Sequence, residues 1–122
     1  MLLKPNVLHQ ILNQANTNGA IATVLLDKNG LLIASAGEGC EVMSAVLSNI
    51  WTYYEKSENI LELIMIEQEK DKIVLCKVTP SLLLAIRGDN TAEFGFLKIK
   101  LKKLKEYLRQ PLMNVMECDR PA

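Results

Sequence analysis

The strand-forming segments of this chain are apolar on both faces, and this feature restricts the possible folds more than any other. In residues 20–26 (AIATVLL) and 31–36 (LLIASA), apolar side chains occupy nearly every position. Because successive strand residues point to opposite faces of a sheet, both faces of this sheet must be covered. Asn29-Gly30 lies between the two segments and favours a tight hairpin. The sequence therefore predicts a central sheet that is shielded on both sides.

Three segments with helical periodicity can supply the covering layers. Pro5 fits a first helical turn, and the apolar spacing after it predicts a helix over 5–16. A clearly amphipathic pattern predicts a second helix over 41–56. A third helix is expected over 91–109, with Pro111 as its end. The apolar stripe expected to face the core from the second helix consists of Met43, Val46, Leu47, Ile50, Trp51 and Tyr54.

The remaining segments complete an α/β (α+β) fold. Strands are expected over 60–67, 72–79 and 82–86, with a loop at 87–90. The predicted order is therefore α-β-β-α-β-β-β-α, which fits a three-layer α/β/α sandwich around a five-stranded, mainly antiparallel sheet. We expect a single domain over 1–115 and a short tail over 116–122.

The composition is that of one compact domain without net charge. The chain has 122 residues, of which 49% are hydrophobic, and its 14 Lys and Arg balance its 14 Asp and Glu. A chain of this length can bury a core without disulfides, and its apolar content excludes disorder. Because the net charge is zero, a nucleic-acid partner is disfavoured. The apolar runs fall far short of the ~20 residues that a spanning helix needs, so no direct membrane insertion is expected.

We find no cluster of residues typical of an enzyme, a cofactor site or a metal site. Cys40, Cys76 and Cys118 are widely spaced, and His9 is the one histidine, which disfavours a zinc site and a disulfide framework. The Gly-Glu-Gly segment at 37–39 is a fragment of a phosphate-binding loop, but it lacks the third glycine and the lysine. It is interpreted as a strand-to-helix turn. We expect no catalytic residues, no cofactor and no metal, and a cytoplasmic protein with reduced thiols.

Two surfaces have patterns that fit binding. The second helix and the strand at 60–67 have more apolar width than one sheet face requires, and the pattern alone leaves open whether the excess is core or partner surface. The densest charge run contains Lys98, Lys102 and Lys105, which form a possible docking face. Its alternatives are a solvated helix face, contact with an acidic partner and contact with anionic lipid.

Several short motifs occur in a specific order along the chain. They are QANTxG at 14–19, LLxxxGxLxA at 25–34, SNIWxxY at 48–54, LLL at 82–84, GxLKxK at 95–100 and YLxxPL at 107–112. Together they resemble the Roadblock-type dynein light chain domain family. Within that family they are most similar to the adaptor subunits of Ragulator complexes at late endosomes and lysosomes, the MAPK and mTOR activators.

The resemblance implies a detailed architecture. The sheet order would be 2-1-5-4-3, with the first and third helices on one face and the second helix on the other. The second helix and the third strand would pair with a second Roadblock-type subunit to give a continuous ten-stranded sheet. The interface residues expected by this analogy are Ala45, Asn49, Tyr53, Ile60, Glu62 and Ile64.

The resemblance also implies a function as a non-catalytic scaffold. The chain would form a heterodimer within a Ragulator-like complex, held by a lipid-anchored scaffold subunit on the cytosolic face of late endosomes or lysosomes. That complex would recruit Rag-type small GTPases and components of MAPK and mTOR signalling.

Other functions stay open on the sequence alone. One is a homodimeric Roadblock protein in dynein cargo attachment or small-GTPase regulation. Another is an enzyme or ligand-binding domain of profilin-like architecture, which would require a pocket near residues 37–39. The segments before 48–51 and after Tyr54 are shorter than in animal adaptors, and Glu38 replaces an aromatic residue. These departures leave the exact partners open.

Overall fold

The order of helices and strands is the one that the sequence predicts. A computed structural model describes residues 4–57 and 60–118, with side chains up to residue 114. The last residues of the expected tail, 119–122, lie outside the described residues. The elements are α1 (Pro5–Gln14), β1 (Ala20–Asp27), β2 (Leu32–Gly37), α2 (Cys40–Ser57), β3 (Leu63–Glu67), β4 (Asp71–Thr79), β5 (Leu82–Asp89) and α3 (Phe94–Cys118).

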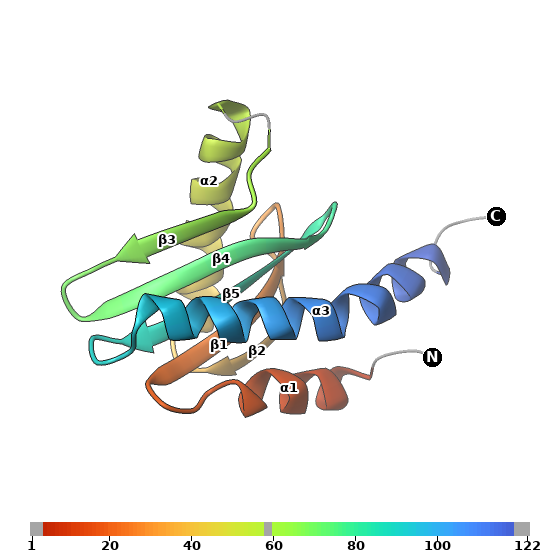
Figure 1. Cartoon of the computed structure of the whole chain (residues 1–122). Helices are drawn as coiled ribbons and strands as arrows, with labels where there is room; N and C mark the ends of the chain where they lie inside the picture. The colour runs from red at the N-terminus through yellow and green to blue at the C-terminus, as the bar shows by residue number, and fades with distance from the viewer. Residues whose placement is uncertain (1–3, 58–59, 119–122) are drawn as a thin grey trace.

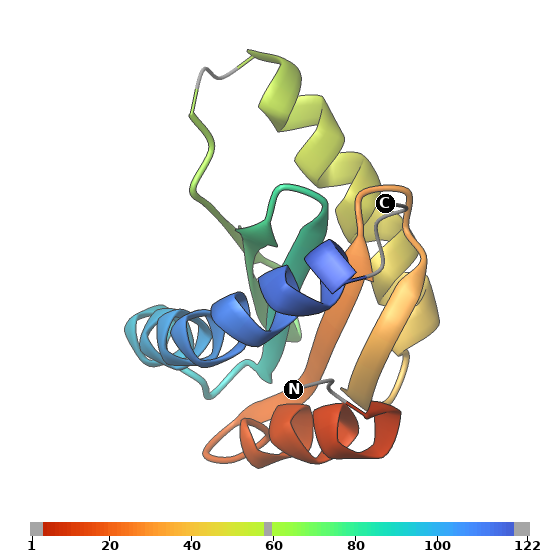
Figure 2. The same ribbon diagram turned by 90° about the vertical axis from the view of Figure 1, so that its right-hand side faces the viewer.

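The expected three-layer sandwich is confirmed. The strands form one sheet in the order β2-β1-β5-β4-β3, and each neighbouring pair is antiparallel. α1 and α3 pack on one face of the sheet and α2 on the other (Figures 1 and 2). β2 and β3 are the two edge strands.

The central strands bury both of their faces, as their apolar sequences require. Towards α1 and α3, Leu25 and Leu84 pack against fully buried leucines of these helices. Towards α2, Leu26 and Leu83 pack around Trp51, which has no exposed surface. Burial of one such side chain stabilises the fold by about 1.5–3 kcal/mol. Two cores on opposite faces therefore hold the sheet, and the cysteines within them, Cys40 and Cys76, are free thiols.

The third helix differs from its expected limits. α3 begins at Phe94 rather than at residue 91, and it continues through Pro111 to Cys118. A proline inside a helix removes one backbone hydrogen bond and costs about 3 kcal/mol. Leu108 and Leu112, on either side of Pro111, are both buried against the core and offset this cost. Figure 1 shows the last turns of α3 bending away from the axis of its first part.

The fifth strand is longer than expected. β5 extends to Asp89, and Gly88 pairs with Ala20 of β1 and with Lys72 of β4. A Cβ atom at Gly88 would lie 2.7 Å from the Cβ of Ala92, so the segment before α3 passes directly over this strand. The Arg-Gly-Asp segment at 87–89 is typical of a loop, but here the glycine permits a close approach of backbone within a strand.

We expect Gly37→Ala to destabilise the protein by at least about 2 kcal/mol, because of strain at this position. Gly37 has a φ of +115°, and a Cβ would lie 2.5 Å from the carbonyl oxygen of Ile21. Gly95→Ala is the matched control, since a Cβ there meets nothing within 4 Å. That change should stabilise α3 by about 0.5–1 kcal/mol. Urea denaturation followed by circular dichroism measures both, and a Gly37→Ala variant as stable as the parent would contradict the packing of β2 against β1.

Candidate partner interface

Two buried serines determine how α2 lies on the sheet. The Ser44 hydroxyl lies 3.3 Å from the Gly30 carbonyl oxygen and 3.0 Å from that of Glu41, and Ser48 donates to the Ala45 carbonyl at 2.9 Å. A Cβ at Gly30 would lie 2.9 Å from the Ser48 hydroxyl oxygen, so helix and turn are in close contact. Only small side chains fit between them. Because backbone carbonyls accept from both hydroxyls, burial of these polar groups carries little penalty.

The position of the serines turns apolar residues of α2 outward. Met43, Leu47 and Trp51 are buried, as the sequence predicts. Val46 and Tyr54 were expected in the same core stripe, but they are 50% and 47% exposed. This part of the prediction is wrong, because Ser44 and Ser48 occupy the space on the sheet that an apolar pattern assigns to larger residues.

The exposed residues form a stripe along α2, which we call the outer stripe. It consists of Val42, Val46, Asn49 and Tyr53, at spacings of four, three and four residues. This spacing places all four on one side of the helix. Val42 is 72% exposed and Tyr53 is 70% exposed, which is unusual for apolar side chains in a compact domain. Val42 was missed in the sequence, although its spacing to the other three was a usable signal.

The structure places the other expected interface residues in two locations. Ala45 is exposed on the flank of α2 beside the β1–β2 turn, where its Cα would lie 3.6 Å from a Cβ on Gly30. Ile60 and Glu62 are exposed in the segment before β3, and Ile60 is 80% exposed. Ile64 lies in β3 and is half-buried against the α2 side of the core. Asn49 and Tyr53 therefore share one surface with each other, whereas Ala45 points away from β3.

The two edges of the sheet differ in regularity. In β2, Leu25 pairs with Ala34 and Leu26 with Leu32, so Ile33 forms a bulge. In addition, the His9 Nδ1 of α1 lies 2.6 Å from the Ser35 carbonyl oxygen. The β3 strand is regular, and Leu63–Glu67 pair with β4 without a shift in register. Since a bulge discourages the addition of another strand, β3 is the edge that is open to one.

A groove separates α2 from the open edge. Its volume is about 580 Å³, and it is lined by Ile50 and Tyr54 of α2 and by the segment from Leu61 to Glu67, apart from Glu62. The walls are mainly aliphatic. The outer stripe, this groove and the β3 edge are therefore contiguous, and all lie on the α2 side or at the edge of the sheet.

A second hollow of about 240 Å³ lies at the other end of α2, under Val42 and Val46. Asp71 and Arg87 line it, with Oδ2 of Asp71 3.6 Å from Nη1 of Arg87. The Oδ1 of Asp71 and the Nε of Arg87 are buried and have no hydrogen-bond partner among the described residues. Unsatisfied buried polar atoms are costly. These two atoms lie below the surface, but the Asp71 and Arg87 side chains keep part of their area exposed at this end of the outer stripe.

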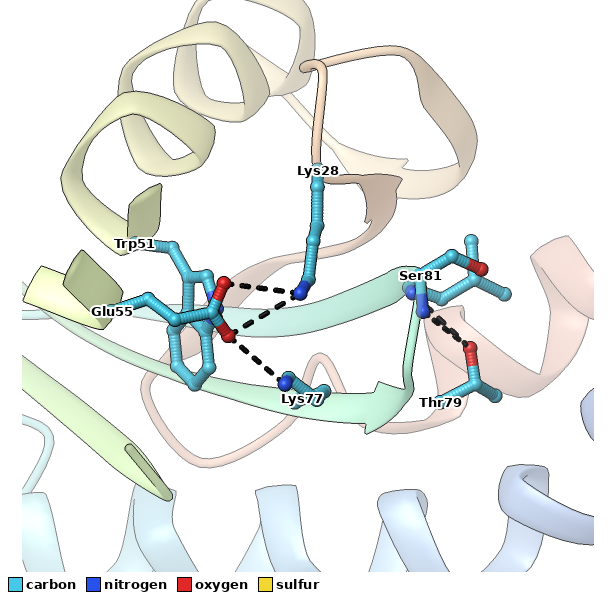
Figure 3. Close-up of polar contacts among 7 residues, drawn as sticks. Lys28, Trp51, Glu55, Lys77, Thr79 and Ser81 are labelled. Atoms are coloured by element: carbon cyan, nitrogen blue, oxygen red, sulfur yellow. Dashed lines mark hydrogen bonds and ion pairs between the residues drawn. The ribbon is translucent and has the colours of Figure 1, made fainter. Parts of the chain in front are cut away.

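An ion-pair network ties α2 to two strands. The Glu55 carboxylate accepts hydrogen bonds from Lys77 of β4 at 2.9 Å, from Lys28 after β1 at 3.1 Å and from the Trp51 indole at 3.2 Å (Figure 3). Hydrogen bonds from the ammonium groups of Lys77 and Lys28 lower the pKa of Glu55 to about 2, and burial acts in the opposite direction. The network holds the last turns of α2 over the sheet and so fixes the position of Tyr53 and Tyr54.

The expected basic face of α3 is exposed on the side of the sheet opposite to α2. Lys98 and Lys102 are exposed, and Lys105 is half-buried. Lys100, which belongs to the same charge run, has a structural role, because its Nζ donates to the Ala15 carbonyl at 2.8 Å and to the Thr17 carbonyl at 2.7 Å. It thereby binds the C-terminal end of α1.

No arrangement typical of a catalytic or metal site occurs in the part of the chain that the structure describes. No group of three His, Cys, Asp or Glu residues could hold a metal ion within 4–57 and 60–118. The hollow beside 37–39 has a volume of about 370 Å³ and is lined by backbone glycines with Ser35, Cys40 and Glu41. Burial raises the pKa of the Cys40 thiol, which favours its protonated form. Within the described ranges, no helix is long and apolar enough to span a bilayer.

Comparison with known proteins identifies one family and a relative that matches nearly the whole chain. The Roadblock/LC7 domain family matches residues 7–87. A relative from Caenorhabditis elegans, described as a Ragulator complex protein LAMTOR2 homolog, is 32% identical over 119 residues, with coverage of 93% of this chain and 96% of the relative.

Solved structures share the fold at lower sequence identity. A Roadblock/LC7 domain from Streptomyces avermitilis superposes with a TM-score of 0.80 at 16% identity, over 86% of this chain and 97% of that one. MglB from Myxococcus xanthus gives a TM-score of 0.74 at 21% identity, over 87% of each chain. At such identities the likeness concerns the fold alone.

We expect Glu55→Gln to lower the free energy of unfolding at pH 7 by about 1–2 kcal/mol, a value reduced for solvent screening because the side chain is a third exposed. The folded-state pKa of about 2 lies below the ordinary value of 4.5. The contribution of Glu55 is therefore fully present above pH 4.5 and is lost as the pH falls towards 2.

Urea denaturation at a series of pH values tests this. The difference between parent and Glu55→Gln should shrink as the pH is lowered from 6 to 3. Glu106→Gln, at an exposed position of α3, should change the stability by less than about 0.5 kcal/mol at any pH. A difference for Glu55→Gln that does not depend on pH would refute the charge network as its cause.

Proposed function

Because this chain belongs to the Roadblock/LC7 domain family, we propose that it is a non-catalytic adaptor subunit that pairs with a second Roadblock-type chain through α2 and β3. One observation carries this proposal. The single regular sheet edge in the described chain lies next to a helix face with four exposed residues in line, three of them apolar or aromatic. A second strand could add its backbone hydrogen bonds to β3 while its own helix covers the outer stripe.

The proposed partner covers specific groups. Burial of Val42, Val46 and Tyr53 supplies apolar contact, and the groove beside Ile50 and Tyr54 accepts side chains of the facing helix. The Asp71–Arg87 ion pair lies beside the same surface, and the exposed parts of these two side chains can bond to polar groups of the partner. Such a combination of apolar centre and a few buried polar groups is typical of specific, stable interfaces.

We further propose that the pair belongs to a Ragulator-like complex. The support is the relative from Caenorhabditis elegans, whose description names the Ragulator complex and whose identity extends over nearly the whole of both chains. In this proposal a lipid-anchored scaffold subunit holds the pair on the cytosolic face of late endosomes or lysosomes. The pair then recruits Rag-type small GTPases and components of MAPK and mTOR signalling.

The experiment that tests the function is affinity purification of the tagged chain from its own cells, read by mass spectrometry. We expect a second Roadblock-type protein in stoichiometric amount, together with Rag-type GTPases. A second experiment measures the oligomeric state of the chain expressed alone, by light scattering. A stable, soluble homodimer without a Roadblock partner in the cell would overturn the heterodimeric adaptor in favour of the homodimeric alternative.

We expect Val46→Asp combined with Tyr53→Asp to weaken the association with the Roadblock partner at least 100-fold. Each change places a carboxylate where an apolar side chain would be buried, and the loss of that burial corresponds to about 1.5–3 kcal/mol for each residue. Both positions are exposed in the single chain, so the variant should keep its circular dichroism spectrum and melting temperature.

Val7→Asp is the matched control for this variant, because Val7 is a 40% exposed apolar residue on α1, on the far side of the sheet. It should leave the affinity unchanged in the same titration. If the double variant still binds with the affinity of the parent, the outer stripe is not the interface.

A further inference from the structure

The positive charge of this neutral chain is concentrated on α3. Residues 94–118 contain six Lys and Arg and two Glu, a net charge of +4, whereas the whole chain has 14 of each sign. The other residues therefore have a net charge of −4. Such segregation creates a local positive potential that the net charge hides.

Four of these cations lie in one line, which we call the basic stripe. It consists of Lys98, Lys102, Lys105 and Arg109, at spacings of four, three and four residues. This spacing keeps them on one side of the helix. Among the described residues, none of the four has a carboxylate within 4.0 Å, whereas Lys28 and Lys77 elsewhere do. The sequence indicated the first three members, and the structure adds Arg109.

The basic stripe borders a hollow at the end of the sheet. Lys105 and Arg109 line this hollow, which has a volume of about 520 Å³, together with Met113, the segment from Lys77 to Pro80 and the segment before β3. Two carboxylates, Glu55 and Glu62, also line it, and Glu55 is paired with Lys77. Since Lys77 is already paired with Glu55, the cations that face the hollow without a partner come from α3. The concave shape favours a protein segment over a flat lipid surface.

An exposed apolar side chain, that of Met65, lies on the same face of the sheet as the basic stripe. Leu63 packs into the core under α1 and α3, whereas Ile64 and Ile66 pack on the α2 side, so Met65 lies on the α3 face of the sheet. Met65 is 53% exposed and pairs with Val74 of β4, a strand that packs directly under α3. The α3 face of β3 therefore presents a methionine next to a row of four cations.

We propose that the basic stripe and Met65 form a docking site for an acidic segment of another protein. Lys98 and Arg109 are eleven residues apart, which corresponds to about 16 Å along a helix. An extended segment covers this length with about five residues. Alternate side chains of that segment would place carboxylates against α3 and aliphatic groups against Met65.

The basic stripe lies on the opposite face of the sheet from the outer stripe, so its cations stay accessible when a partner covers α2. Met65 lies at the sheet edge and also lines the groove beside α2. The docking site extends the adaptor function proposed above, because it gives the chain a second surface for a third protein. It does not depend on the identity of the Roadblock partner.

The test uses the full-length chain and a fluorescein-labelled hexapeptide that alternates glutamate with leucine, measured by fluorescence anisotropy. We expect this peptide to bind at least fivefold more tightly at 50 mM salt than its glutamine counterpart. Its affinity should fall at 300 mM salt, because exposed charges are then screened. The triple variant K98E/K102E/R109E should bind at least tenfold more weakly.

The control variant K56E/K70E/K103E has the same change in net charge at exposed positions outside the stripe, of which Lys103 lies on the α1 side of α3, and it should bind like the parent. Both triple variants should still associate with the Roadblock partner, which separates failure of this site from failure of the proposed function. NMR of methyl-labelled methionines shows where on the protein the peptide binds. The signals of Met65 and Met113 should shift on peptide addition, and that of Met43, buried under α2, should not.

Three results would overturn the proposal. The first is equal binding of the glutamine peptide, and the second is undiminished binding to K98E/K102E/R109E. The third is sedimentation with vesicles that contain 30% phosphatidylserine, dependent on the stripe, in the absence of peptide binding. That last result would assign the stripe to a membrane surface instead.

Discussion

The close approach of α2 to the β1–β2 turn determines how the rest of the surface is used. Gly30 gives room for Ser48, and backbone carbonyls satisfy the hydroxyls of Ser44 and Ser48, so these small residues of the helix face the β1–β2 turn. The large residues Leu47 and Trp51 face the sheet. The ion pairs of Glu55 hold the other end of the helix in place. With both ends fixed, Val42, Val46 and Tyr53 must point to solvent. In a single chain these apolar side chains are exposed to water, which is unfavourable. A second chain that covers them removes this free-energy cost.

The two faces of the sheet are suited to different contacts. The α2 face combines an apolar helix, a groove and an open strand edge, which are the features of a large and stable interface. The α3 face presents four cations and one methionine, which favour a shorter and salt-dependent contact. Both helices repeat their exposed residues at intervals of four, three and four, once with mainly apolar side chains and once with charged ones. In the proposed adaptor, these two faces would serve two different partners.

The layers followed from patterns that depend on local chemistry, because strands that are apolar at nearly every position required cover on both sides. The strand order 2-1-5-4-3 followed only from the resemblance to the Roadblock family. The orientation of α2 did not follow, because Ser44 and Ser48 are polar in sequence and buried in the fold. The continuation of α3 past Pro111 also depends on tertiary packing, through Leu108 and Leu112. The bulge at Ile33, which distinguishes the two sheet edges, arises from the register of β1 with β2 and leaves no signal in composition or periodicity.

Hydrogen–deuterium exchange of this chain, alone and within its purified complex, tests the central claim most directly, because it reports the backbone of both sheet edges at once. If a Roadblock-type partner adds to β3 and covers α2, the amides of 63–67 and of α2 should exchange more slowly in the complex. Those of β2, residues 32–37, should be unchanged. Unaltered exchange in β3, or new protection confined to β2, would contradict pairing through the β3 edge.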